Sequence, residues 1–405
     1  MIVVSNKPRI AVIPAGQFQI QAILDAQSMG YEVVAFDGNP QAPGLKIADF
    51  PEAVNPMDTE RAIALARRYG VVGVVSVAND PCIVPLALLC EALHLPGITP
   101  ELARLARDKS GVRERLRTSL PHYCPRFCVV DNREALPHVG TVCGWPAVLK
   151  PCLSSGSKGV VIVNDETELD AAYQYSSRFT NDNKVLAEEL LIGQEVSVEG
   201  LVADGETYIA AVTDKMTTPP PFCVEIGHSI PSRLSGGIRE EVIRCVRDIT
   251  GTLGLNNCAL HAEIYATARG PKLVEFGARL GGGCITSHLV PLATGINLNR
   301  AVISMATGHA PAVVPTLSQG AAIRFMTPPA GRVTAIRGLS EAMEAPGVVE
   351  VACTLSPGDI VSRLENSDHR VGYVITTGPD AESAMARAAE AVEQIQVETM
   401  RGDSA

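Results

Sequence analysis

The 405 residues, 46% hydrophobic and 19% charged, have the composition of a globular enzyme with room for roughly two to four domains. A formal net charge of −10, without a basic run, argues against a nucleic-acid partner. No stretch has the pattern of a signal peptide or a membrane span, and the 11 cysteines are scattered without a C-x-x-C pair. We therefore expect reduced thiols and a cytoplasmic protein that does not bind membranes.

Strands and helices alternate over residues 9–99. Apolar runs predict strands at 10–13, 32–36 and 71–77, and helical patterns fill 18–29, 59–69 and 80–93. This order predicts a parallel, doubly wound half-domain. Its first turn reads P-A-G-Q and not G-x-G-x-x-G, so a structural or substrate-binding role is favoured over dinucleotide binding.

A loop of small residues separates two strands predicted at 145–150 and 160–163. Because the loop opens a strand and not a helix, it is not a Walker loop. It predicts either a plain surface turn or a hairpin flap whose backbone N–H groups can approach phosphates. Lys150 ends a buried-looking strand, where an unpaired lysine would be costly, and this favours the functional interpretation. Lys109, at a junction between two helices, is by itself more typical of a solvated side chain.

A second hairpin carries opposed carboxylates. Its arms are predicted at 259–267 and 272–276, with a turn at 268–270. Glu263 then lies roughly opposite Glu275, and directly opposed like charges destabilise a strand pair. A divalent metal ion between them is the simplest explanation.

The tail begins with a Pro- and Val-rich linker at 311–315. Strands are predicted at 321–326, 348–353 and 371–376, and a helix at 381–395. These elements form either a small α/β domain or an appendage to the main sheet. No catalytic motif is visible among them.

Six motifs carry a family resemblance, and they occur in one order along the chain. They are D-K-S at 108–110, V-L-K-P at 148–151, S-S-G-S-K-G at 154–159, E-E-L-L-I-G-Q-E-V-S-V-E at 188–199, A-E-I at 262–264 and V-E-F-G-A-R-L-G-G at 274–282. Over roughly residues 9–310 the chain resembles the ATP-grasp superfamily, and within it the dipeptide-forming L-amino-acid ligases. Gly277 stands where many ATP-grasp enzymes have Asn, which favours this branch over biotin carboxylases and carbamoyl-phosphate synthetases.

The resemblance implies an α/β fold, α+β in parts, with the ATP-grasp architecture. We expect a doubly wound pre-ATP-grasp domain at 1–118, a small lid subdomain with the flap at 119–192, a catalytic subdomain with an antiparallel sheet and the metal site at 193–310, and a C-terminal α/β region at 311–405. A homodimer is expected from the superfamily alone.

The resemblance also implies the site. ATP phosphates would contact Lys109, Lys150 and the covering loop, Ser154, Ser155, Gly156, Ser157 and Gly159. Glu188, Glu189, Leu190 and Leu191 would face adenine, mainly through backbone groups, and Glu195 would bind the ribose. Glu263 and Glu275 would hold one or two Mg²⁺ ions, with Mn²⁺ as the alternative. Arg279 would face the transferring phosphoryl group and the bound carboxylate.

Two further residues lie in F-C-V-E-I-G-H-S-I-P-S, a segment that faces the amino-acid pocket in similar ligases. We hypothesise that Glu225 binds a substrate ammonium and that His228 orients the incoming amine or stabilises the intermediate; the alternative is a polar loop over the core. Gly283, four residues past Arg279, would leave space for a larger acceptor.

The implied reaction is ATP-dependent amide formation between a carboxylate and an amine, both expected to come from amino acids, through an acyl phosphate, with release of ADP and phosphate. Two alternatives stay open: an ATP-grasp ligase of the phosphoribosylglycinamide-synthetase-like or formate-dependent type, and an ATP-binding regulator without turnover.

Overall fold

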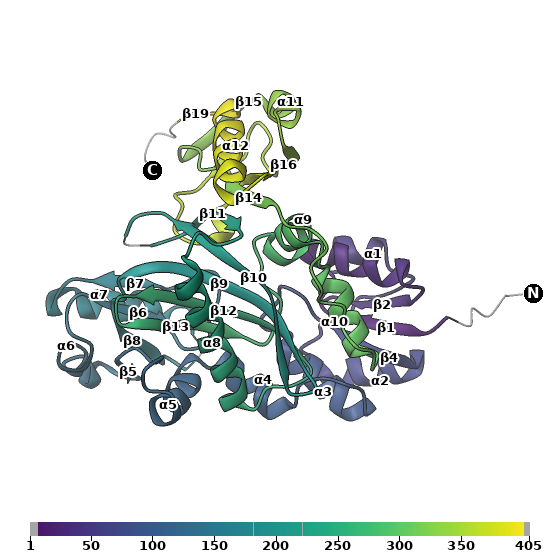
Figure 1. Ribbon diagram of the computed structural model, residues 1–405, viewed down its shortest axis with the longest axis horizontal. Coiled ribbons are helices and arrows are strands. Elements are labelled where there is room, and N and C mark those ends of the chain that lie inside the picture. The colour runs from purple at the N-terminus through teal and green to yellow at the C-terminus, as the bar shows by residue number, and fades with distance from the viewer. Residues whose placement is uncertain (1–6, 181, 221, 401–405) are drawn as a thin grey trace, which may run out of the picture.

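The computed structural model describes residues 7–180, 182–220 and 222–400. In Figure 1 an N-terminal lobe and a small lobe flank a central sheet, and the end of the chain rises above it. The ends of the predicted first and last domains, residues 1–6 and 401–405, lie outside the described residues. No helix in the described part is both long and apolar enough to cross a membrane.

The N-terminal lobe contains the predicted parallel sheet. Its strand order is β3-β2-β1-β4, and every pair is parallel. The strands are β1 (Arg9–Val12), β2 (Glu32–Phe36), β3 (Phe50–Glu52) and β4 (Val71–Val75). The neighbouring helices are α1 (Ile20–Ser28), α2 (Thr59–Tyr69), α3 (Ile83–Leu93) and α4 (Pro100–Arg107). The expectation of a doubly wound half-domain is thus confirmed.

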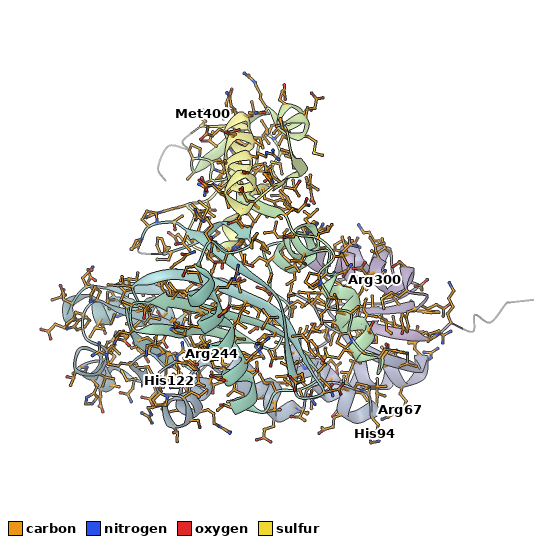
Figure 2. The ribbon with its side chains drawn as sticks, viewed as in Figure 1. Arg67, His94, His122, Arg244, Arg300 and Met400 are labelled. Carbon is orange, nitrogen blue, oxygen red and sulfur yellow. The ribbon has the colours of Figure 1, made fainter. Side chains whose placement is uncertain are left out.

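A late helix packs against this lobe. Helix α10 (Leu298–Ala306) contacts α1, where Asn297 Nδ2 donates to the Asp25 carboxylate at 3.3 Å. Arg300, labelled in Figure 2, donates to Ser28 Oγ at 2.7 Å. Residues nearly 300 positions apart therefore share one packed layer.

The small lobe has an antiparallel sheet of order β5-β8-β6-β7. It comprises β5 (Phe127–Val130), β6 (Ala147–Pro151), β7 (Val161–Val163) and β8 (Val185–Glu189), with α5 (Lys109–Ser119), α6 (His138–Cys143) and α7 (Leu169–Ser177) nearby. Because β6 and β7 pair antiparallel, the small-residue loop between them is the tip of a hairpin, as predicted.

The central sheet has eight strands in the order β13-β12-β9-β10-β11-β14-β18-β16. The strands are β9 (Gly193–Ala203), β10 (Glu206–Thr217), β11 (Glu225–Ile230), β12 (Cys258–Thr267), β13 (Gly270–Gly277), β14 (Gly320–Phe325), β16 (Val348–Cys353) and β18 (Gly372–Gly378). Helix α8 (Gly236–Leu253) buries Val242, Val246 and Ile249 in the core that includes this sheet. Residues 225–230 are a strand and not a polar loop.

The C-terminal region continues the main sheet. Strands β14, β18 and β16 extend it. A second sheet of order β17-β15-β19 contains β15 (Gly331–Arg337), β17 (Ile360–Val361) and β19 (Gln396–Met400), beside α11 (Leu339–Glu344) and α12 (Ala381–Gln394). The sequence prediction missed these three strands, whose side chains are mostly half-buried or exposed.

Short elements complete the described chain. They are the 3₁₀ turns Gln17–Gln19, Pro43–Lys46, Arg133–Ala135, Glu166–Glu168 and Ser367–His369, the π-turn η5 (Ile285–Leu289) and α9 (Val290–Thr294).

Candidate active site

A cavity of about 320 Å³ lies where the lobes meet the central sheet. The N-terminal lobe contributes Asp80, the β6–β7 loop contributes Ser155 and the C-terminal region contributes Arg370. Most predicted site residues line it, namely Lys150, Ser155, Gly156, Ser157, Glu188, Glu189, Leu190, Leu191, Glu195, Glu225, Glu263, Glu275 and Arg279. Lys109, Ser154, Gly159 and His228 lie outside this lining.

Lys109 links the β6–β7 loop to the carboxylate hairpin. Asp108 caps helix α5 by accepting from Ser110 N at 3.0 Å, which fixes Lys109 in the first turn. Lys109 Nζ donates to the carbonyl of Ser154 and lies 3.2 Å from Glu275 Oε1. The side chain is 8% exposed, so this lysine is not the solvated one that its position alone suggested.

Lys150 belongs to a buried ion triad. Its Nζ lies 2.5 Å from Glu188 Oε2, and Arg113 Nε lies 2.5 Å from Glu188 Oε1. Burial opposes the charge of Lys150 and lowers its pKa despite Glu188. Burial also opposes ionisation of Glu188, but the two cations outweigh it and lower the pKa of that carboxyl. The lysine is therefore paired and held at the cavity wall.

The adjacent carboxylate is also paired. Glu189 accepts from Arg126 Nε at 3.2 Å and from Arg269 Nη2 at 2.9 Å. The side chains of Glu188 and Glu189 are therefore both engaged in ion pairs.

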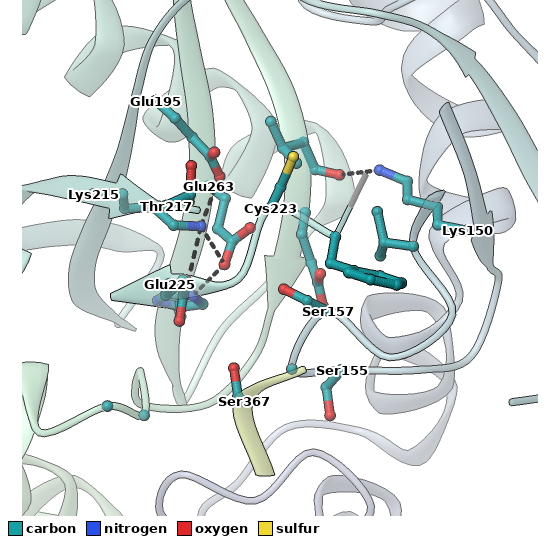
Figure 3. Close-up of a pocket in the computed structure, with 18 of the residues that line it drawn as sticks. Lys150, Ser155, Ser157, Glu195, Lys215, Thr217, Cys223, Glu225, Glu263 and Ser367 are labelled. Atoms are coloured by element: carbon teal, nitrogen blue, oxygen red, sulfur yellow. Dashed lines mark hydrogen bonds and ion pairs between the residues drawn. The ribbon is translucent and has the colours of Figure 1, made fainter. Parts of the chain in front are cut away.

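Lys215, which the sequence analysis passed over, joins three carboxylates (Figure 3). Its Nζ lies 2.6 Å from Glu195 Oε1, 3.0 Å from Glu225 Oε1 and 3.1 Å from Glu263 Oε1. Burial disfavours the ammonium, but the three carboxylates outweigh it and raise the pKa of Lys215 well above its ordinary value. Burial raises the pKa of Glu195, while Lys215 outweighs burial at Glu263 and holds the pKa of that carboxyl well below its usual range.

Alternation along β10 predicts which side chains share a face, but it does not predict that three acids from β9, β11 and β12 converge on one lysine. That information is tertiary, because β10 pairs with β9 and β11, and β9 in turn pairs with β12.

The sequence analysis also missed an ion pair next to Glu263, between His261 and Glu199. His261 Nδ1 is 2.7 Å from Glu199 Oε1, and its Nε2 is 3.3 Å from Glu263 Oε1. Burial disfavours the imidazolium, but Glu199 outweighs it and raises the pKa of His261 to about 9. Gly281 N donates to Glu199 at 3.2 Å, so this pair also fixes the glycine-rich segment after β13.

Glu225 and His228 form another corner of the site. His228 is fully buried, and its Nε2 lies 3.7 Å from Glu225 Oε2. Burial lowers the pKa of His228 to about 4, so the ring is neutral at pH 7. Burial opposes ionisation of Glu225 as well, but Lys215, His228 and Arg370 outweigh it and lower its pKa to about 2.

Arg279 joins the hairpin to the N-terminal lobe. Its Nε donates to Asp80 Oδ1 at 3.3 Å, and its Nη1 donates to the carbonyl of Leu280 at 3.1 Å. Burial disfavours the guanidinium charge, but Asp80 and Glu275 outweigh it and raise the pKa of Arg279. A charged arginine is thus held at the cavity by residues from two lobes.

The two carboxylates predicted to hold a metal have the donor type that Mg²⁺ accepts. Glu263 and Glu275 are direct cross-strand partners and both line the cavity. Within the described residues no three His, Cys, Asp or Glu side chains gather as a metal site. Mg²⁺ suits such a place, because it is held by one or two carboxylates and takes its other ligands from water and phosphate.

The C-terminal region also reaches the cavity, through Ser367, Asp368 and Arg370. Lys158 Nζ in the β6–β7 loop lies 2.7 Å from Asp368 Oδ2, and Ser367 N donates to the carbonyl of Gly156 at 3.3 Å. The sequence showed no catalytic motif in this region, because these contacts arise only when β18 joins the main sheet.

Comparisons with known proteins agree with this arrangement. Residues 143–287 match the ATP-grasp domain, and residues 324–400 match the L-amino acid ligase C-terminal domain 2. The L-amino acid ligase from Bacillus licheniformis has the same fold, with a TM-score of 0.82 at 22% identity over 98% of this chain and 100% of that one.

Two of the curated relatives are named as different enzymes. Alanine–anticapsin ligase of Bacillus subtilis (strain 168) is 30% identical over 249 residues, which is 55% of this chain and 51% of that protein. The chain thus spans about half the length of this relative. A formate-dependent phosphoribosylglycinamide formyltransferase of Solidesulfovibrio magneticus is 26% identical over 97% of this chain and 98% of its own.

Proposed function

Because the chain carries an ATP-grasp domain and an L-amino acid ligase C-terminal domain, we propose that it joins the carboxylate of one amino acid to the amine of another at the expense of ATP. The observation that carries this proposal is the position of Glu225, with the buried His228 beside it, in the same cavity as the opposed carboxylates Glu263 and Glu275. An anionic group for a substrate ammonium thus adjoins a place suited to a metal and phosphates.

The chemistry follows from the charges. A carboxylate is a poor acyl donor until its oxygen becomes a good leaving group, so attack on the γ-phosphoryl group of ATP would give an acyl phosphate and ADP. The amine would then displace phosphate and form the amide. Mg²⁺, when bound by Glu263 and Glu275, supplies neutralisation of phosphate charge.

The chain's own residues would do the positioning. Lys109 and Lys150 are charged donors for phosphate oxygens, and the small residues of the β6–β7 loop let backbone N–H groups come close. Arg279 would hold the carboxylate that becomes activated. The loop must cover the intermediate, because water would otherwise hydrolyse it.

His228 has a proposed role in the second step. At pH 7 it is neutral, so its ring can accept a proton from the attacking amine. We expect His228→Ala to lower turnover at saturating substrate while ATP binding is retained. Unchanged turnover would remove this role.

The test of the function is a matrix of amino-acid pairs assayed for phosphate release, with mass spectrometry of the products. A ligase releases ADP only when both a carboxylate and an amine are present, and the product mass equals their sum less one water. ADP release that ignores the amine would overturn the proposal.

One observation favours a second candidate. The formate-dependent relative matches almost the whole chain, whereas the B. subtilis ligase matches about half of it. The same assay with formate and phosphoribosylglycinamide distinguishes this candidate, because its product has a different mass.

A further inference from the structure

A corner beside the cavity contains buried polar atoms that lack hydrogen-bond partners. Among the described residues, both ring nitrogens of His228 and Nη1 of Arg370 are in this state. His228 is completely buried, and the Arg370 side chain is 13% exposed. Because unsatisfied buried polar groups are costly, such atoms indicate a ligand that completes them.

Arg370 is held rigidly although Nη1 is unpaired. Its Nε donates to the carbonyl of Ser367 at 3.0 Å, and its guanidinium carbon lies 4.1 Å from the centre of the Phe325 ring. The same ring meets His228 edge to face, with centroids 6.2 Å apart. Phe325 therefore orients the two side chains toward a common space.

The charges around this space are mixed. Glu225 Oε2 lies 3.7 Å from Arg370 Nη1 and 3.7 Å from His228 Nε2, which is too long for a hydrogen bond in either case. A carboxylate beside a guanidinium is complementary to the ammonium and carboxylate groups of one amino acid.

Gly283 keeps the space open. A side chain at this position would place its Cβ 3.3 Å from His228 Nε2 and 3.9 Å from Arg370 Nη1. The backbone of Gly283 also has a φ of +59°, which disfavours other residues. Absence of a side chain thus avoids crowding beside both unpaired groups.

We propose that Arg370 binds the free carboxylate of the accepting amino acid, while Glu225 and His228 receive its amino group. This rests on the proposed ligase function. In that reaction one carboxylate is activated and the other stays free. Arg279, tied to Asp80, is assigned to the first, and Arg370 is the partner available to the second.

The experiment compares an acceptor amino acid with its primary amide, which keeps the amine but lacks the negative charge. The wild-type enzyme should prefer the free acid. Arg370→Met should lower kcat/KM for the acid roughly 10- to 100-fold, mainly through KM, because a hydrogen bond to a charged group is lost. Its kcat/KM for the amide should change by about twofold or less, and Arg370→Lys should be intermediate.

Arg363→Met is the matched control. This arginine belongs to the same segment and lies over an aromatic ring, Phe222, at 5.4 Å, but it is exposed and does not line the cavity. It should leave the acid-to-amide preference unchanged. A thermal shift with Mg-ADP confirms that each variant is folded and binds nucleotide.

The proposal fails if Arg370→Met lowers activity equally with acid and amide, or leaves the acid unaffected. It also fails if the wild-type enzyme does not distinguish acid from amide, a result that needs no variant to fold. Failure of the ligase function itself would differ, since no amino-acid pair would then release phosphate from the wild-type enzyme.

Discussion

Lys158 and Asp368 join two distant parts of the chain, with Nζ 2.7 Å from Oδ2. The lysine belongs to the loop between β6 and β7, and the aspartate to the 3₁₀ turn before β18. Their side chains are 37% and 68% exposed, so the ion pair lies at the surface and its contribution to the free energy is small. We infer that this ion pair favours the position in which the β6–β7 loop covers the cavity.

Asp368→Asn should raise KM for ATP modestly, by about two- to fivefold, because an exposed ion pair contributes roughly 0.2–1 kcal/mol. The difference from wild type should shrink at high salt. Asp204→Asn, an exposed acid in the β9–β10 turn, is the control and should have no effect. If the charge swap Lys158→Asp with Asp368→Lys is worse than either single change, the bias does not come from this pair.

Glu275→Gln should abolish ADP release while the protein stays folded, and Glu263→Gln should do the same. Each change removes one of the two opposed carboxylates proposed to hold Mg²⁺. ADP is quantified under saturating ATP, and circular dichroism monitors the fold. Glu206→Gln, an exposed glutamate on β10, controls for the chemical change. Normal ADP release from a folded Glu275→Gln protein would refute the metal assignment.

Glu188→Gln should lower the free energy of unfolding by about 3–5 kcal/mol, because it leaves Arg113 and Lys150 without their shared buried anion. Urea unfolding measures this loss. Lys150→Met should be milder for stability, since Glu188 keeps Arg113, yet it should weaken ATP binding. Equal unfolding free energies for Glu188→Gln and wild type would show that the triad does not stabilise the fold.

His228 makes stability depend on pH. Its folded pKa of about 4 lies below the ordinary 6.5, so the unfolded chain binds a proton first as pH falls. The contribution of His228 to the free energy of unfolding is fully present above pH 6.5 and decreases by about 3 kcal/mol toward pH 4. The charged groups around the ring are Glu225 on its own strand, Lys215 on β10, Glu199 on β9 and Arg370.

Urea unfolding between pH 7 and 4.5 measures this loss. His228→Gln has no titratable ring and should flatten the curve between pH 6.5 and 5, above the range in which Glu225, with its pKa of about 2, becomes protonated. An unchanged slope would assign the acid sensitivity to other groups.

Much of the fold followed from local pattern. Helix 59–69 and strand 348–353 were predicted with the bounds that the structure has, because glycine and apolar periodicity mark their ends. Strands β15 and β19 were missed. They pair with each other at the surface, where alternation is weak, and only their partner defines them.

The site residues likewise include some that local sequence could predict and some that it could not. Glu263 and Glu275 were predictable because a short turn fixes the register of a hairpin. Lys215 and Arg370 were not, since each depends on strands that are distant in sequence and become neighbours only in the eight-stranded sheet.

The order of the central sheet bears on how the chain can be shortened. Strand β11, which carries Glu225 and His228, pairs with β10 on one side and β14 on the other. Ending the chain before β14 would strip one row of backbone partners from β11 and create an open edge, which invites aggregation. Residues of β14 are therefore part of the wall that supports Glu225 and His228, and we expect a protein truncated before β14 to aggregate.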